Sequence, residues 1–319
     1  MWKTIIRRLL LMIPQILILS ILIFIIADFM PGDPFTGLID PNLDPAQLEA
    51  MRESYGLNDP LPVKYIRWMT NAFQGDFGRS FNYQQPVTAV IAGRLGNTVR
   101  LSLLSVILTY AVGLPLGIVA GRYNESVLDK TILVYNFVSF AVPIFVLALL
   151  MVWIFGYNLN WFPARGSVSI SATTPWEIWK SQMYHVLLPA ITTAMLGTTS
   201  IIQYLRSEII DAKVSDYVKT ARSKGVPIQK VYTRHIFRNA SLPIASGFGY
   251  TIVSLFTGSI FIEQIFTYRG MGYLFLQSIN TRDYSVIFVL VLFYGFLALI
   301  GTLLSDLILM AVDPRIRID

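Results

Sequence analysis

The chain has no cysteine and only two histidines among its 319 residues. The missing thiols exclude disulfide bonds and thiolate metal sites, and they say nothing about the compartment of the protein. The histidines, His185 and His235, lie far apart in the sequence, and no H-x-x-x-H spacing is present. We therefore expect no metal ion and no other cofactor on this chain.

Charged residues are scarce: they make up 14% of the chain, whereas hydrophobic residues make up 54%. A membrane-spanning helix needs about 20 mainly apolar residues. Uncharged windows of about this size occur at 9–27, 101–121, 131–157, 186–205, 239–262 and 284–305. The first window is longer than the apolar region of a signal peptide and lacks an A-x-A-like site, so we expect it to stay as an anchor. We predict an all-α integral membrane protein with six transmembrane helices.

The few lysines and arginines collect on one side of these windows, which predicts the orientation because short cytoplasmic loops carry an excess of basic residues. The basic side holds both chain ends and the segment 206–243, so both termini are expected to be cytoplasmic. This distribution also accounts for the sequence pI of about 9.4 without nucleic acid as a partner.

The predicted spans divide the chain into three parts. Residues 1–30 form the cytoplasmic N-terminus and first helix, 31–97 an extracytoplasmic insertion, and 98–319 a core of helices two to six with a cytoplasmic loop at 206–243. Prolines interrupt the insertion, although 46–55 has a helical pattern. We expect a small folded cap, which serves either as a structural lid or as a docking surface for a substrate-delivery protein.

Four charged residues lie within or beside the apolar windows, all near the window ends: Asp28, Arg100, Glu208 and Asp306. A charge at the bilayer centre costs about 2.5–3.5 kcal/mol on insertion scales. Positions near the ends favour snorkelling or ion pairing at the interface over a proton relay, which needs buried carboxylates near the midplane.

Catalytic motifs are also missing. The chain has no G-x-x-x-x-G-K-[ST] phosphate loop and no G-x-S-x-G turn, so it lacks the elements that bind nucleotide phosphates or present a nucleophilic serine. We predict that the chain is not an enzyme and that any ATP hydrolysis takes place on other chains.

Glycines repeat at every fourth position of the second window, at Gly113, Gly117 and Gly121. Such small-xxx-small patterns let a second helix approach closely. Packing within the chain is favoured here over a contact between subunits.

The most informative segment is 206–243, a basic stretch between two apolar windows. At helical spacing, one face carries Ile210, Val214, Tyr217, Val218 and Ala221, and the other carries Asp216, Lys219 and Arg222, which is typical of a surface helix. Gly225 predicts the helix end, and a second short helix is expected to begin near Pro227.

This segment resembles the cytoplasmic loop of ABC-importer permeases. The permeases that import oligopeptides and dipeptides resemble it most. The resemblance spans the whole chain. One departure is that the general permease motif has Glu-Ala-Ala before its glycine, where this chain has Lys219-Thr220-Ala221, so a role of that glutamate is not carried over. The matching motifs are Asp216-Tyr217-Val218-Lys219-Thr220-Ala221-Arg222-Ser223-Lys224-Gly225, Arg234-His235, Arg238-Asn239-Ala240, Pro31-Gly32-Asp33-Pro34, Tyr55-Gly56-Leu57, Gly75-Asp76-Phe77-Gly78-Arg79-Ser80, Phe162-Pro163-Ala164, Arg282-Asp283-Tyr284 and Asp313-Pro314-Arg315-Ile316-Arg317.

The resemblance implies the type I ABC importer permease fold in a bacterial cell membrane. It also implies several partners: a second, related permease, two cytosolic ATPase subunits that carry ATP and Mg, and an extracytoplasmic peptide-binding protein. The residues expected to couple the chain to the ATPases are Asp216, Tyr217, Val218, Lys219, Ala221, Arg222, Lys224 and Gly225.

Within that site, Ala221 and Gly225 are expected to allow close approach, Tyr217 and Val218 to give apolar contact, and the cations to face acidic or polar groups of the partner. The cations can instead serve only to fix the topology. Two other functions stay open: a related importer for nickel, haem or another small solute, and a self-sufficient secondary transporter or channel.

Overall fold

A computed structural model describes residues 2–29, 46, 49–50, 53 and 58–312. These residues form helices joined by loops, so the predicted all-α membrane fold is confirmed. The pattern at 46–55 falls largely outside the described residues. The helices in chain order are α1 (Trp2–Asp28), α3 (Leu61–Phe73), α4 (Val87–Arg122), α5 (Val127–Ala141), α6 (Ile144–Met151), the π-helix η1 (Val152–Asn158), α7 (Pro175–Lys213), α8 (Asp216–Ser223), α9 (Ile228–Lys230), the π-helix η2 (Val231–Ile236), α10 (Phe237–Ala240), α11 (Leu242–Thr257), α12 (Ile260–Ile265), α13 (Met271–Asn280) and α14 (Tyr284–Val312).

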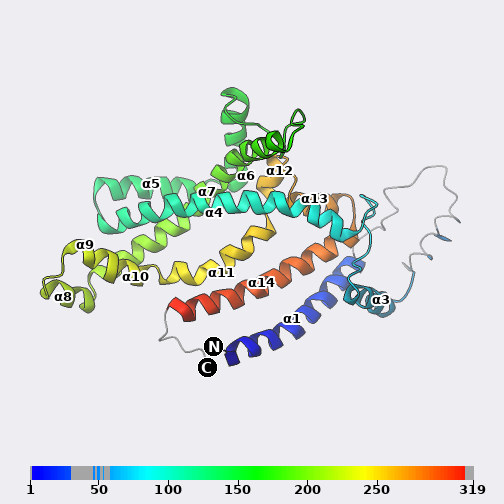
Figure 1. The fold of residues 1–319 in the computed structure, drawn as a ribbon, viewed down its shortest axis with the longest axis horizontal. Helices are drawn as coiled ribbons and strands as arrows, with labels where there is room; N and C mark the ends of the chain where they lie inside the picture. Colours follow the sequence, from blue (N-terminus) through cyan, green and yellow to red (C-terminus); the bar gives the residue numbers. More distant parts are fainter. Residues whose placement is uncertain (1, 30–45, 47–48, 51–52, 54–57, 313–319) are drawn as a thin grey trace.

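Among the described residues, five segments are long and apolar enough to cross a membrane: Ile5–Ile26 in α1, then α4, α7, Leu242–Ile265 and α14. Figure 1 shows α1, α14, α11 and α4 running beside one another across the molecule. α1 begins and α14 ends toward the same end of the bundle as the short helices α8–α10. α4 begins at Val87, inside the range 31–97 that was assigned to the insertion, while the division into three parts stays a prediction.

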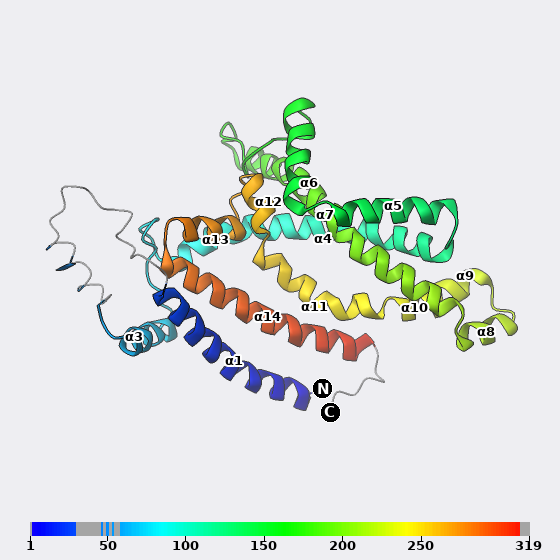
Figure 2. The same cartoon turned by 180° about the vertical axis from the view of Figure 1, so that it is seen from behind.

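The third predicted span, 131–157, differs from a straight helix. It consists of α5 followed by α6 and η1, and the two halves are bent by 102°. Pro143 precedes α6 and cannot donate a backbone hydrogen bond, and Val142 before it is extended with φ −85° and ψ 120°. The second half therefore turns away from the bundle and stands crosswise to α4 (Figure 2).

The centre of the bundle is the packing of α4 against α7. Gly113, Gly117 and Gly121 on α4 all face α7, which lies so close that a methyl group on any of them would crowd it. An added Cβ would come within 3.0 Å of the Cβ of Ile201, 2.9 Å of that of Leu205 and 2.7 Å of that of Ile209, respectively. The two backbones are thus in near contact over two helical turns.

Two buried carboxylates fix the end of the bundle opposite α8–α10. Glu263 of α12 accepts hydrogen bonds from Thr98 Oγ1 and the Tyr273 amide, both at 2.9 Å, so it joins α12 to α4 and to the first turn of α13. Asp283 accepts from Ser80 Oγ at 2.5 Å and from the amide of Asn82 at 3.2 Å. Asp283 thereby fastens the loop before α4 to the corner between α13 and α14.

We expect Gly121→Ala to destabilise the protein by about 1–3 kcal/mol, because the new methyl group overlaps Ile209 and forces α4 away from α7. Gly93→Ala in the same helix is the control, since nothing lies within 4 Å of its added Cβ and alanine favours the helix. Thermal unfolding in detergent measures both. Equal melting temperatures for the two variants would contradict the close packing.

Candidate functional site

The candidate site lies where α7 ends and the basic segment begins. α7 ends at Lys213, and α8 (Asp216–Ser223) starts after a turn at Val214 and Ser215. The side-chain hydroxyl of Ser215 donates to the carbonyl of Ala212 at 2.6 Å and closes this turn. The predicted single helical face from Ile210 to Ala221 is therefore wrong, because Ile210 and Val214 do not belong to the same helix as the rest.

The apolar side of α8 faces its own chain. Val218 is fully buried and Ala221 is buried, and both belong to a cluster with Leu205 and Ile209 of α7. These two residues therefore attach α8 to α7 and do not present an apolar surface to a partner. Tyr217 remains 41% exposed, so it is the apolar residue of this helix that is available for contact.

The polar side of α8 is open to solvent. Lys219 Nζ and Asp216 Oδ1 form an exposed ion pair at 3.0 Å, and Arg222 and Lys224 are also exposed. Such a surface pair contributes at most about 1 kcal/mol to stability, so these charges are free to meet a partner.

Gly225 ends this helix as the sequence predicts. Its φ is +71°, its amide donates to the carbonyl of Arg222 at 2.9 Å, and no atom lies within 4 Å of an added Cβ. The requirement for glycine is thus a backbone one. The second short helix follows Pro227 and is made of α9 (Ile228–Lys230), the π-helix η2 (Val231–Ile236) and α10 (Phe237–Ala240).

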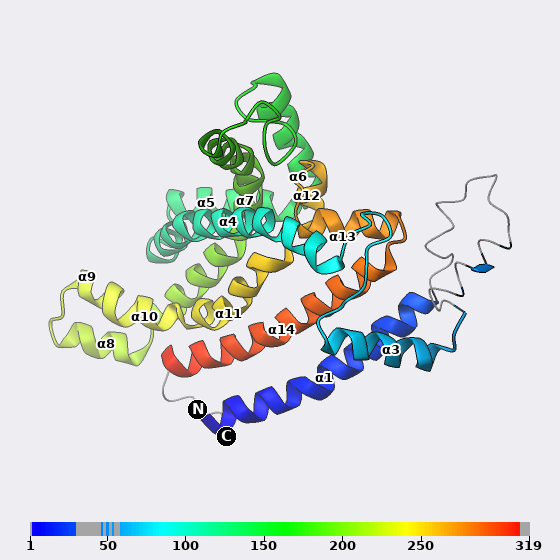
Figure 3. The same ribbon diagram turned by 45° about the vertical axis from the view of Figure 1, so that its right-hand side comes forward.

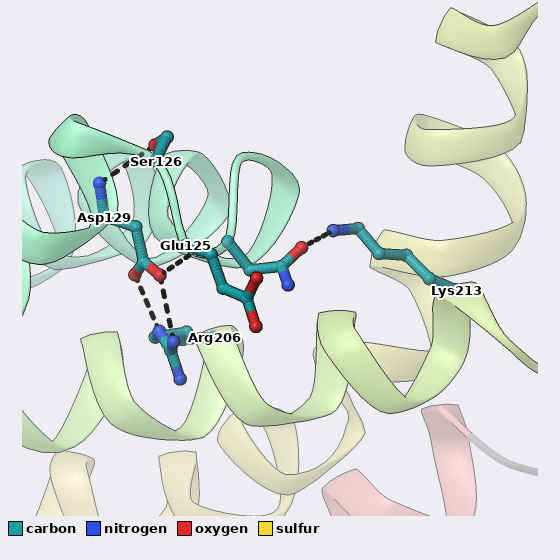
Figure 4. Close-up of polar contacts among 6 residues, drawn as sticks. Glu125, Ser126, Asp129, Arg206 and Lys213 are labelled. Carbon is teal, nitrogen blue, oxygen red and sulfur yellow. Dashed lines mark hydrogen bonds and ion pairs between the residues drawn. The ribbon is translucent and has the colours of Figure 1, made fainter.

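An ion pair joins the first turn of α5, directly after the α4–α5 turn, to α7. Arg206 donates from Nε to Asp129 Oδ1 at 2.7 Å and from Nη2 to Oδ2 at 2.9 Å, a two-pronged geometry (Figure 4). The side chain of Asp129 is 1% exposed and that of Arg206 25%. The amide of Glu125 donates to Asp129 as well, at 2.7 Å. Bidentate pairs of this kind fix both distance and orientation.

Two further contacts attach the same turn to the segment around α8. Lys213 Nζ, at the last residue of α7, donates to Asn124 Oδ1 at 2.5 Å (Figure 4). The Arg122 guanidinium stacks over the ring of Tyr232 in η2, 4.8 Å from its centroid. The ends of α4 and α7, the start of α5 and the short helices α8–α10 therefore form one connected body.

Asp129 was not among the residues expected to be functional. A signal for it is present, since Ser126-Val127-Leu128-Asp129 precedes an apolar run with the spacing of a helix cap. The Ser126 hydroxyl accepts a hydrogen bond from the Asp129 amide at 3.2 Å. The pairing with Arg206, 77 residues further on, has no sequence signature.

Comparison with known proteins decides the family. Residues 113–318 match the model of the binding-protein-dependent transport system inner membrane component, and residues 1–102 match the N-terminal model of the same membrane component. The chain belongs to this family. The segment of α7, α8 and Gly225 lies within the first of the two matches.

Relatives match along almost the whole chain. An oligopeptide transport system permease protein of Bacillus subtilis (strain 168) is 39% identical over 314 residues, 98% of each chain. A putative peptide permease protein of Brucella suis biovar 1 (strain 1330) is 35% identical over 315 residues, again 98% of each. A putative peptide transport system permease protein of Brucella abortus (strain 2308) is 36% identical over 320 residues, the full length of both.

We expect Arg206→Gln to destabilise the protein by about 3 kcal/mol, because it leaves the buried Asp129 carboxylate without its partner, and Asp129→Asn to destabilise it less, because the Arg206 side chain is 25% exposed. The double variant should recover part of this loss, since it removes both charges. Lys219→Gln in the exposed pair is the control and should change stability by less than about 0.5 kcal/mol. Thermal unfolding of the four variants checks the expectation, and single variants as stable as the control would contradict it.

Proposed function

We propose that this chain is a transmembrane subunit of an ATP-driven importer and forms part of the translocation pathway for oligopeptides or dipeptides. The family supports the transport role, and the names of the relatives support peptide as the cargo. The observation that carries the coupling role is α8: its buried residues attach it to α7, and its exposed charges face away from the chain.

In this proposal α8 lies in the cytosol and binds a partner ATPase. Asp216, Lys219, Arg222 and Lys224 meet polar or acidic groups there, together with the exposed ring of Tyr217. Val218 and Ala221 act indirectly by holding α8 on α7. The orientation follows from the basic residues, and it places both chain termini in the cytosol.

The mechanism we propose is alternating access. ATP-bound dimerisation of the ATPases brings together α8 of this chain and the corresponding helix of a second permease, so that the cavity between the two permeases opens outward. Hydrolysis returns it inward. The Asp129–Arg206 pair supports this mechanism, because a displacement of α8 is passed to α7 and to the α4–α5 turn together.

A peptide brings charged termini and backbone amides, which require a water-lined route through the bilayer. One bundle of this size offers few polar groups for such a route, so we propose a second permease that encloses the cavity with this chain. An extracytoplasmic binding protein supplies the peptide, and ATP and Mg reside on the ATPases. A different small solute as cargo, or a self-sufficient secondary transporter, is not favoured by the relatives.

We expect Gly225→Val to reduce ATP-dependent uptake several-fold while insertion into the membrane stays normal. A β-branched residue at φ +71° is strained by about 1–2 kcal/mol, and the end of α8 must move. Gly225→Asn is the matched control, because asparagine tolerates the left-handed region and should retain uptake. Normal uptake by the valine variant would remove Gly225 from the coupling site.

We also expect the purified chain alone neither to hydrolyse ATP nor to transport peptide. The chain is reconstituted into liposomes that are loaded with ATP, with the binding protein and labelled peptide outside. The ATPases are added first, and a second permease is added next. Accumulation should begin only when all components are present.

Peptide accumulation by this chain alone would contradict the proposal that it is an importer subunit. Accumulation with the ATPases and without a second permease would show instead that two copies of this chain suffice, which contradicts only the heterodimer.

A further inference from the structure

α3 (Leu61–Phe73) belongs to the insertion, yet it packs against two membrane spans. The Tyr65 hydroxyl lies 2.7 Å from Ser20 Oγ of α1, and the Tyr65 ring meets Phe24 edge-on with centroids 5.4 Å apart. Trp68 meets Phe288 of α14 in the same way at 4.2 Å. One side of α3 is therefore anchored on α1 and α14.

The depth of these contacts follows from the two spans independently. Ser20 precedes the end of α1 at Asp28 by eight residues (28 − 20), which corresponds to about 12 Å along a helix. Phe288 follows the start of α14 at Tyr284 by four residues (288 − 284), or about 6 Å. Both contacts lie inside the ends of apolar spans, so α3 sits below the level at which α1 and α14 leave the bilayer.

The direction of α3 agrees with this depth. In Figure 1 the spans α1 and α14 run across the picture, whereas α3 is seen nearly end on beside the end of α1. After the turn in Figure 3, α3 is seen lengthwise. The axis of α3 thus runs crosswise to α1 and α14.

The side of α3 that faces away from the spans is amphipathic. Val63, Ile66 and Phe73 are 45%, 64% and 84% exposed, and at 100° per residue they fall within one sector of the helix. Thr70 lies in the same sector, and its hydroxyl donates to the Ile66 carbonyl at 2.8 Å. Arg67 and Asn71 occupy the neighbouring sector, and Arg67 Nη2 pairs with Asp59 Oδ2 at 2.7 Å. The exposed surface thus has an apolar edge and a polar edge.

We propose that α3 is an interfacial helix embedded in the leaflet at the end of the bundle opposite α8, with lipid as the partner of its apolar edge. Val63, Ile66 and Phe73 contact acyl chains, while Arg67 and Asn71 reach the headgroups. Exposed apolar side chains also occur on the neighbouring span α1, where Leu22 and Ile26 are 52% and 62% exposed.

The chemistry of α3 fits that environment. Interfacial helices combine one strongly apolar face with a basic polar face, and tyrosine and tryptophan gather at the level of the headgroups. A charged side chain at this depth can extend to water along its aliphatic stem, as Arg67 does in its pair with Asp59. A docking surface for a soluble protein needs to stand clear of the membrane, and the contacts with Ser20 and Phe288 place α3 below that level.

Site-directed spin labelling tests the proposal, and the chain suits it because it has no native cysteine. A nitroxide is attached at Ile66→Cys and, as the matched control on the polar edge, at Asn71→Cys. The labelled transporter is assembled in lipid nanodiscs with partner subunits that contain no cysteine. Accessibility is measured to oxygen, which concentrates in lipid, and to a water-soluble nickel chelate. We expect the ratio of oxygen to nickel accessibility to be several-fold higher at position 66.

Equal ratios at the two positions would overturn the proposal, because the apolar edge would then lie in water. A label at position 66 that neither probe reaches would show that a protein subunit covers the edge. A change at position 66 when the binding protein is added, with none at 71, would identify a docking surface instead. Val63→Cys is the second site if the Ile66 variant does not assemble, and it carries the same expectation.

Discussion

The near contact of α4 with α7 is the constraint on which the rest of the structure depends. The three glycines bring the two backbones together, and every other part of the connected body around α8 is attached to one of these helices. α5 is joined to α7 by the Asp129–Arg206 ion pair, and α8 packs against α7 through Val218 and Ala221. A larger side chain at any of these three glycine positions would push α4 and α7 apart and shift all these contacts.

Charge is used sparingly and at the ends of the spans. Asp129 at one end and Glu263 and Asp283 at the other are all fully buried, and each links segments that are distant in sequence. Asp306 near the end of α14 pairs with Arg8 of α1 at 2.7 Å, as expected for a charge near a span end. A carboxylate with several donors around it holds loop and helix in one relative position, which apolar packing in lipid cannot do because lipid competes for apolar contacts.

The sequence predicts the fold class well because the physical signals are strong and local. Long uncharged windows identify the spans, and Gly225 and Pro227 mark the end of α8 and the next helix. The bend at Pro143 is harder to predict, since a proline in an apolar window is compatible with a kink as well as a break. The turn at Val214 and Ser215 is hidden because the apolar spacing continues across it by chance.

Tertiary partners are the part that periodicity does not contain. Glu263 follows directly on the apolar window that ends at residue 262, so the window itself gives no sign that this carboxylate is buried against Thr98. The burial of Val218 and the pairing of Asp129 with Arg206 likewise depend on how α7 passes the α4–α5 turn. Short-range spacing identifies the faces of a helix, and only the packed chain decides which face turns inward.

The length of α7 has a mechanical consequence. Its 39 residues make a rod of about 58 Å, roughly twice the thickness of the hydrocarbon core, about 30 Å. A rod of that length that pivots near its middle by about ten degrees displaces each end by about 5 Å. In the proposed mechanism α7 is a lever, in which the arm beyond the membrane carries α8 and the other arm carries the loop before Pro175.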